Sequence, residues 1–351
     1  MRRSAAIAFG LAAAAGLSCS NGAQDTADRV HDLRVLAFRA DPPDQVLRAS
    51  FQPDGGMKTA RLPPDGGAAL DGGLGPALAI TPITVTALVA DPAGAGRDIH
   101  CRWTTCAQTD GTTGRCEDAS PMFAVLGVAD VVAGVDGAEP AVTFTPDTAM
   151  LFALQQVDPY RGLRGLWHLV QLEVTAGDEN VVAQKRAVVT LSVDEVPPPP
   201  NRNPVLDTLR FDDEDWAPDA EVTFASAVRS RTGFGPLSGT APAPANKVEP
   251  IPDPALAEDY TVTTFDGQTK SLHEAWRYNF FTTQGSFSRA STGATSPLDT
   301  TPPLDTRWQA LAPEDGGLAT VWVVVRDGRG GESWLVRHAQ APEVALPRPG
   351  R

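Results

Sequence analysis

Positive charge is scarce in this chain of 351 residues, which has 29 Lys and Arg against 43 Asp and Glu. The formal net charge is −14. Binding to a nucleic-acid backbone requires a basic surface that displaces counterions, so this composition argues against a nucleic-acid partner. The same acidity disfavours direct attraction to anionic lipid headgroups.

Motifs for catalysis and metal binding are also missing. The chain has no HExxH pair, no GxSxG elbow around a serine and no P-loop. Its five histidines lie far apart in the sequence, at His31, His100, His168, His273 and His338. The sequence therefore predicts a non-enzymatic protein that uses no cofactor.

Uninterrupted segments for long helices are lacking, because 32 Gly and 31 Pro punctuate the chain. Both residues disfavour helix interiors, so a helical bundle or coiled coil is excluded in favour of many short strands joined by turns. The hydrophobic fraction of 42% is ordinary for a globular protein, which argues against a fully disordered chain.

The first residues have the layout of a signal peptide. Arg2 and Arg3 precede an uncharged apolar stretch from Ala5 to Leu17, and small residues follow it. This stretch is shorter than the ~20 apolar residues that cross a bilayer as a helix. We therefore expect export and removal of residues 1–18.

The end of this segment, Gly16-Leu17-Ser18-Cys19, resembles the lipobox of bacterial lipoproteins, in which the cysteine becomes the lipidated first residue. The resemblance implies a lipid on Cys19 that makes the membrane a partner, and a tether over residues 19–31. Ser20 after the cysteine implies the outer membrane or cell surface. The alternative is cleavage by ordinary signal peptidase, which would leave Cys19 unmodified and the protein periplasmic or secreted.

The length is that of about two domains, and Pro197–Pro200 marks the boundary between them. Four successive prolines favour an extended, semi-rigid spacer. Residues 52–76 repeat Asp-Gly-Gly and are predicted to form a disordered insertion. The predicted boundaries are 32–196 for the first domain, 197–203 for the linker, 204–342 for the second domain and 343–351 for a disordered tail.

The second half repeats the pattern of the first. The similar pairs are Leu33–Phe38 with Val205–Phe211, Thr84–Val89 with Ala220–Phe224, Cys101–Cys106 with Tyr278–Gly285, and the hairpin 167–193 with the hairpin 320–336. Residues 147–157 have good helix formers and predict one short helix. We therefore expect two copies of one β-rich unit.

An aromatic residue on the third main strand and a closing Val-x-Val-x-Asp-Gly-x-Gly-Gly hairpin, here Val323–Gly331, resemble the immunoglobulin-like (Ig-like) and PKD-like domains of bacterial surface proteins. Their arrangement after a lipobox resembles tandem Ig-like lipoproteins. The resemblance implies an all-β fold of two tandem Ig-like β-sandwich domains, with one or two short helices and disordered insertions. It also implies a structural or protein-interaction module of the cell envelope, with an unidentified protein or glycan partner.

Three cysteines remain besides Cys19, and an exported protein can keep a disulfide. If Trp103 points into a core, Cys101 shares its face and Cys106 lies at the end of the strand. We therefore favour a disulfide between Cys106 and Cys116, and Cys101–Cys116 is the rival. A metal site would need a second cysteine or histidine pair, which the sequence lacks.

Two further features are candidate binding sites. The acidic run Asp212–Asp215 suits calcium by its oxygen ligands, although a solvated turn is the simpler interpretation. The second half also concentrates aromatic residues, and exposed rings can stack on sugars. Trp276, Trp308 and Trp334 are therefore candidates for carbohydrate or peptidoglycan binding, against the simpler interpretation that aromatic residues fill the core.

Overall fold

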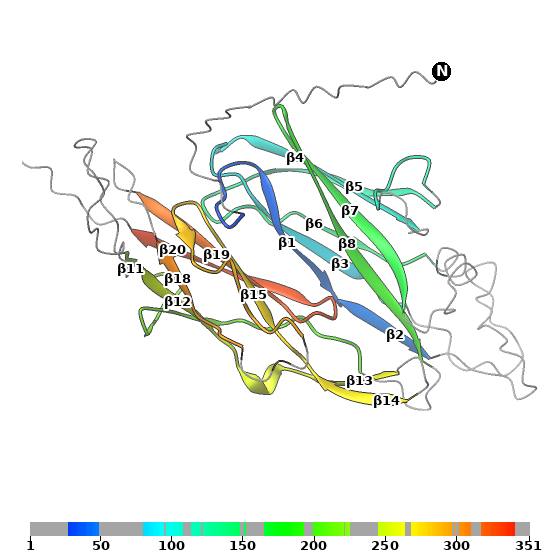
Figure 1. The fold of residues 1–351 in the computed structure, drawn as a ribbon. Coiled ribbons are helices and arrows are strands. Elements are labelled where there is room, and N and C mark those ends of the chain that lie inside the picture. The colour runs from blue at the N-terminus through cyan, green and yellow to red at the C-terminus, as the bar shows by residue number, and fades with distance from the viewer. Residues whose placement is uncertain are drawn as a thin grey trace, which may run out of the picture.

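The fold was analysed in a computed structural model of the chain (Figure 1). The structure describes residues 27–48, 80–94, 96–107, 114–120, 122–147, 151, 165–192, 199–220, 222–224, 245–263, 268–296, 299, 302–309 and 317–340. The predicted signal peptide, the insertion 52–76 and the tail 343–351 lie outside these ranges. No helix in the described ranges is both long enough and apolar enough to cross a membrane.

The first half is a sandwich of two β-sheets. One sheet has three strands, in the order Arg34–Asp41 (β1), Ile83–Ala90 (β3) and Ala141–Phe144 (β6). The other has five strands, in the order Asp44–Arg48 (β2), Glu179–Ser192 (β8), Leu166–Ala176 (β7), Asp98–Ala107 (β4) and Ala124–Val132 (β5).

The second half is also a sandwich. One sheet has the order Glu214–Asp215 (β10), Thr208–Phe211 (β9), Asn246–Ile251 (β12), Thr306–Gln309 (β18) and Ser286–Phe287 (β16). The other has the order Val222–Thr223 (β11), Glu332–Gln340 (β20), Leu318–Arg326 (β19), Arg277–Thr282 (β15) and Ser291–Gly293 (β17). A separate hairpin, Asp259–Thr263 (β13) and Thr269–His273 (β14), follows the 3-10 helix Pro254–Leu256 (η1).

The two sandwiches share one topology. In each, an early strand crosses to the other sheet and pairs in parallel with the last strand: β2, which follows β1, pairs with β8, and β11, which follows the β9–β10 hairpin, pairs with β20. The remaining pairs of the five-stranded sheets are antiparallel, which is the arrangement of Ig-like sandwiches. The predicted fold class is confirmed. Of the helix predicted over 147–157, the structure describes Leu151, whose amide donates to the carbonyl of Asp147 in a helical turn.

The topology corrects one part of the predicted repeat. Ala220–Phe224 contains β11 and therefore corresponds to β2, whereas the sequence match with Thr84–Val89 assigned it to β3. The position of β3 is taken by β12, which pairs with β9 as β3 pairs with β1. Alternating residues identify a strand but do not say which sheet it joins, and the prolines Pro42 and Pro218 mark the change of sheet in both halves.

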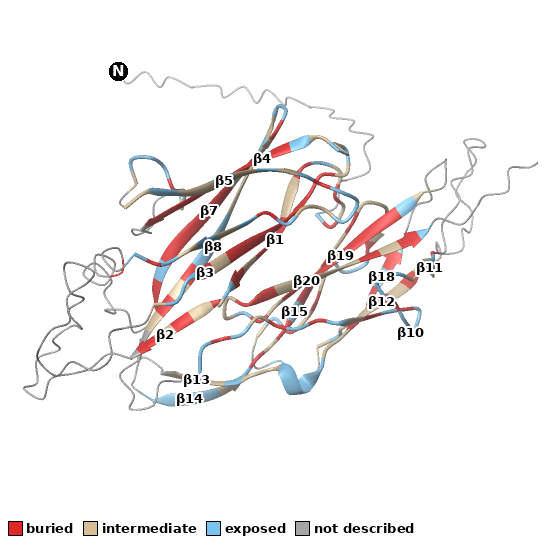
Figure 2. Cartoon of the chain, turned by 180° about the vertical axis from the view of Figure 1, so that it is seen from behind, coloured by how far each residue is buried: buried red, intermediate tan, exposed pale blue. Residues whose placement is uncertain are grey.

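Three apolar cores separate four stacked sheets. The core of the first sandwich contains Trp103, and the core of the second contains Trp308. A third core, which we call the interface core, lies between the sandwiches, where β1 and β3 face β15, β19 and β20. Because β3 and β19 each contribute to two cores, both strands are buried along almost their whole length (Figure 2).

Two tryptophan side chains donate hydrogen bonds at the edges of the interface core. The Trp322 ring nitrogen Nε1 donates to the carbonyl of Asp136 at 2.8 Å, and Trp334 Nε1 donates to the Glu139 carboxylate at 2.8 Å. The Arg39 guanidinium lies 5.0 Å from the centre of the Trp334 ring. These contacts pair groups that the packing of the two sheets would otherwise remove from water.

The residues that precede β1 in the sequence contact the second sandwich. The Asp28 carboxylate accepts a hydrogen bond from the Phe287 amide at 2.5 Å, and the Asp28 carbonyl accepts one from the Thr282 amide at 2.9 Å. The Val30 amide donates to the Thr282 carbonyl at 2.8 Å. Asp28 and Val30 are both buried, and the backbone at Arg29 pairs with Thr282 of β15. The tether predicted for 19–31 is therefore wrong at its C-terminal end.

The residues after the proline run also lie between the sandwiches. The Asn201 amide donates to Asp44 Oδ1 at 2.7 Å, and its side-chain Nδ2 donates to Asp327 Oδ2 at 2.7 Å. Residues 193–198 lie outside the described ranges. The linker predicted at 197–203 therefore ends in a buried junction, and the two halves that it joins are packed against each other.

The interface core predicts that both halves unfold together. Trp322 is 1% exposed, and Trp322→Ala should lower the free energy of unfolding by about 3–5 kcal/mol in a single transition. Urea titration followed by circular dichroism and by tryptophan fluorescence measures this. Trp167→Ala is the matched control: its ring is 39% exposed, and the loss should be at most about 1 kcal/mol. Two separate transitions in the unsubstituted chain would contradict the prediction.

Candidate functional site

The outer faces of two of the five-stranded sheets, the one from β2 to β5 and the one from β11 to β17, form the candidate interaction surface. These sheets have the same strand order, so they can be aligned by their inward pairs, Trp103 with Leu172 and Phe280 with Val323. In the second sandwich the outer face is covered by β1 and β3 of the first sandwich. In the first sandwich a disulfide-linked segment covers the part of the corresponding face around Leu169 and Gln171.

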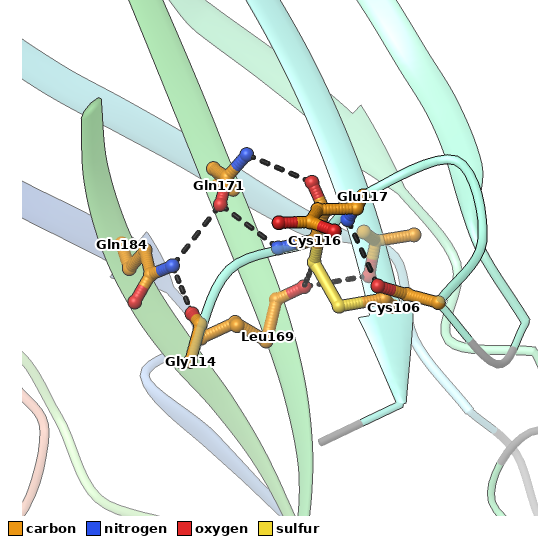
Figure 3. Close-up of a disulfide and its surroundings, with 9 residues drawn as sticks. Cys106, Gly114, Cys116, Glu117, Leu169, Gln171 and Gln184 are labelled. Carbon is orange, nitrogen blue, oxygen red and sulfur yellow. Dashed lines mark hydrogen bonds between the residues drawn. A yellow bond between two sulfur atoms is a disulfide. The ribbon is translucent and has the colours of Figure 1, made fainter. Parts of the chain in front are cut away.

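This disulfide-linked segment lies between β4 and β5. Cys106 at the end of β4 is bonded to Cys116, and the two sulfur atoms pack on Leu169 of β7 together with Phe123 (Figure 3). Cys106, Cys116 and Leu169 are buried. The disulfide therefore holds the connection between β4 and β5, at Cys116, against the outer face of β4 and β7.

Two glutamine side chains bind the backbone of the segment (Figure 3). Gln171 on β7 accepts from the Cys116 amide at 2.9 Å through Oε1 and donates to the Cys116 carbonyl at 3.1 Å through Nε2. Gln184 on β8 donates to Gln171 Oε1 at 3.0 Å and to the carbonyl of Gly114. The Gln171 side chain thus accepts one hydrogen bond from the Cys116 backbone and donates one to it, as a residue of a neighbouring β-strand would.

The aligned sheets place different residues at the same outer positions. Gln171 and its neighbour Gln184 correspond to Trp322 and its neighbour Val336. The amide side chains bind a backbone segment, whereas the apolar side chains pack against the sheet of a neighbouring domain. One repeated unit therefore covers its outer face in two chemically different ways.

The structure decides between the two disulfides that the sequence left open. Cys106–Cys116 is confirmed, with Cα atoms 5.5 Å apart. Cys101 is a free thiol in the core of the first sandwich, and burial raises the pKa of this thiol to about 11. Such a thiol is protonated and inaccessible at neutral pH. Cys19, the predicted lipidation site, lies outside the described residues.

The three tryptophans predicted to bind sugar are not available for stacking on a ligand. Trp276 and Trp308 are buried in the core of the second sandwich. Trp334 is partly buried between Arg39 and the interface core, and its ring nitrogen is bonded to Glu139. The carbohydrate interpretation is therefore not supported. Its simpler alternative is confirmed for Trp276, Tyr278 and Phe280, which fill one core as their alternation predicts.

Ionisable side chains gather where the hairpin loop of β19 and β20 meets the linker. Arg329 donates to Glu258 at 3.1 Å and to Glu274 at 2.9 Å, and its guanidinium lies 4.4 Å from the centre of the Tyr260 ring. Burial raises the pKa of Glu274 and the pKa of nearby Asp327. Arg329 supplies the positive charge that balances these carboxylates, as a bound cation would in an acidic junction.

Sequence reasoning missed this junction, because its members come from distant segments. Lys185 of the first sandwich pairs with Glu332 of the second at 3.3 Å, and both side chains are largely buried. Arg326 pairs with the same carboxylate at 2.5 Å. The Asp-Gly-x-Gly-Gly pattern of the hairpin loop was the available signal, since Asp327 accepts from the amides of Arg329 and Gly331 within that loop.

The acidic run Asp212–Asp215 forms a turn with partners of its own. Asp212 accepts from the side chain of Asn246 at 2.6 Å, and Asp213 pairs with Lys247 at 2.7 Å. Asp212 and Asp213 have φ values of 50° and 72°, in the left-handed region that Asp tolerates in turns. In the described ranges, no group of three or more His, Cys, Asp or Glu is arranged to hold a metal ion.

One histidine differs from the others in its surroundings. His168 on β7 is 1% exposed, and its ring nitrogen Nε2 has no hydrogen-bond partner in the part of the chain that the structure describes. Burial lowers the pKa of His168 to about 4. By contrast, His100 and His273 are exposed and pair with Asp130 and Asp259.

Comparisons with known proteins do not assign this chain to a family. No protein-family model and no curated protein matches the sequence. Among solved structures, dimeric latent PorU from Porphyromonas gingivalis is 10% identical over 91% of this chain at a TM-score of 0.20, and this chain spans 25% of the PorU chain.

Two further solved structures are similar at the same low level. Protocadherin gamma B2 extracellular cadherin domains 3–6 are 13% identical over 90% of this chain and 53% of theirs, with a TM-score of 0.17. A chimeric titin Z1Z2 tandem is 8% identical over 75% of this chain and 90% of its own, with a TM-score of 0.15. The Ig-like assignment therefore depends on the strand order of the chain itself.

Opening the disulfide should destabilise the first sandwich. A variant with Cys106→Ser and Cys116→Ser loses a bond that spans a sequence separation of 10, which corresponds to about 3 kcal/mol of unfolding free energy. Urea titration under non-reducing conditions measures the loss. A dithiol reductant should lower the stability of the unsubstituted chain by a similar amount and leave the double variant unchanged. An effect of the reductant on the double variant would contradict this assignment.

His168 should make stability depend on pH. Its pKa is lower in the folded chain, at about 4, than the usual 6.5, so its full contribution to stability is present above pH 6.5 and is lost as the pH falls toward 4. The loss should approach about 3 kcal/mol. The measurement is the difference in unfolding free energy between the unsubstituted chain and His168→Gln at pH 7.5 and pH 4.5. His273→Gln, at an exposed position, should show no such difference.

Proposed function

We propose that the chain is a non-enzymatic, lipid-anchored protein of the cell envelope, whose two Ig-like sandwiches act as one rigid interaction module. The observation that carries this proposal is the interface core, in which one sandwich binds the other through a whole sheet face. A unit that uses a sheet face and its polar edges in this way is built for protein contacts rather than for enclosing a small substrate.

The polar groups of the junction support a structural role. Arg329, Lys185 and Arg326 are paired with carboxylates, and Asn201 is bonded to Asp327. These groups are engaged with each other, whereas a catalytic pocket would direct several titratable groups toward a shared ligand. Their pairing fixes the angle between the two halves.

The position of the N-terminal residues supports anchoring close to a bilayer. Asp28 and Val30 are bonded to the second sandwich, so a lipid on Cys19 would be separated from Asp28 by the eight residues 20–27. Such a segment reaches at most about 30 Å when fully extended. The module would therefore be held near the membrane at the junction of its two halves, and the net charge of −14 would keep its surface from adhering to anionic lipid.

The anchoring part is tested with Cys19→Ser. The unsubstituted chain should incorporate a labelled fatty acid and fractionate with the envelope membranes, whereas Cys19→Ser should lose the label and become soluble. Cys101→Ala is the matched control, because Cys101 is buried and should not be acylated. An unmodified N-terminus beyond Cys19 in mass spectrometry of the mature protein would overturn the proposal of a lipid anchor.

A further inference from the structure

Exposed apolar side chains gather at one edge of the first sandwich. Eight large hydrophobic residues are exposed in the described ranges, and half of them lie on β5 or just after it. These four are Val125, Val128, Val132 and Val135, with exposed fractions of 52–64%. Concentrated exposure of this kind marks a contact surface, whereas single exposed residues are common on any protein.

β5 is also the last strand of its sheet. It pairs with β4, and no other backbone partner of residues 124–132 is present in the described part of the chain. The strand has nine residues and a single charged side chain, Asp130. A long edge strand with few charges offers a row of free backbone donors and acceptors to another strand.

The second sandwich shows how this chain protects the corresponding edge. β17 occupies the same last position in its sheet, but it has three residues. Its Gly293 amide donates to the carbonyl of Pro303 at 2.9 Å, and the Thr292 hydroxyl donates to the carbonyl of Leu304 at 2.7 Å. Among the described residues, one repeated unit therefore has a short, covered edge, and the other has a long edge strand with no backbone partner beyond β4.

We propose that β5 is a self-association strand, through which two copies of this chain pair antiparallel and join their five-stranded sheets. An isologous pair of identical strands closes on itself, so it gives a dimer rather than an open polymer. Its hydrogen bonds come from the backbone, and its specificity comes from the side chains on either side of the two-fold axis.

The sequence of β5 suits pairing with itself. The bulge opposite Trp103 and Thr104 lies at Leu126, so the regular part of a self-pair centred on Val128 is Gly127–Ala129. An antiparallel pair centred on Val128 places this residue opposite Val128 of the other copy. Asp130 then does not face Asp130 of the other copy, and its carboxylate Oδ1 is hydrogen-bonded to His100 Nδ1 at 2.7 Å. The exposed valines of both copies form one continuous apolar strip.

The net charge determines how this dimer should respond to salt. Each copy carries −14, so two copies repel each other at low ionic strength. Salt screens this repulsion and leaves apolar and backbone contacts in place. The dimer should therefore become stronger as salt rises, whereas an interface built from ion pairs would weaken.

The test is analytical ultracentrifugation of the chain with Cys19→Ser, so that lipid cannot drive association. At 0.5 M NaCl we expect a monomer–dimer equilibrium, with the dissociation constant raised at least tenfold by Val128→Lys. Val135→Lys is the matched control, because Val135 is equally exposed but lies beyond β5, and it should leave the constant within about twofold. Circular dichroism establishes that each variant is folded.

A second measurement tests the register. Val128→Cys should form a disulfide-linked dimer under mild oxidation, and Val135→Cys should not. A chain that stays monomeric up to about 100 μM at both low and high salt would overturn the inference, as would a dimer that Val128→Lys leaves intact. Either result would leave the lipid anchor on Cys19 unaffected, because the two proposals involve different residues and different measurements.

Discussion

The apolar contact between β1 and β3 of the first sandwich and β15, β19 and β20 of the second determines the architecture. A sheet has two faces, and an apolar face must be covered by another layer. β3 and β19 are buried on almost all of both faces, so separating the two sandwiches would expose Leu88 and Ala90 of β3 and Trp322 and Val324 of β19 to water. Stacking four layers covers both strands, and the strap Asp28–Val30 and the junction around Asn201 then fix the layers at their edges.

Much of the fold follows from the sequence, because alternation and turn residues locate strands. The hairpins β7–β8 and β19–β20, the strand β6 and the repeat itself are all visible in the pattern. The partner of each strand is not, because alternation is a local property and sheet order is a long-range one. Val321–Val325 is apolar throughout and lies in the central strand of its sheet, but the sequence does not show that one of its faces is buried by the other sandwich. β5 was missed since its apolar residues do not alternate with polar ones.

The candidate site likewise has features that the sequence predicts and features that it does not. The disulfide could be predicted because the parity of Cys101, Trp103 and Cys106 along one strand separates inward from outward side chains. The core position of Trp276 agrees with the simpler interpretation from sequence, but the position of Trp334 at the interface core could not be predicted, because the sequence does not show that the two halves pack together. The junction around Arg329 joins segments more than 50 residues apart in the chain, and its spacing carries no local signal.

The two outer sheet faces explain why the stack has two members. The second unit presents Trp322 and Val336, which the first unit covers, and the first unit presents Gln171 and Gln184, which bind its own disulfide-linked segment. Terminal members of stacked repeats need such a cap, because an uncovered apolar face would recruit another unit. The disulfide-linked segment covers the part of this face around Gln171 and Gln184, so another sheet cannot stack there. The open backbone edge at β5 then remains as the direction in which the sheet can still be extended, and a two-fold pair would end that extension as well.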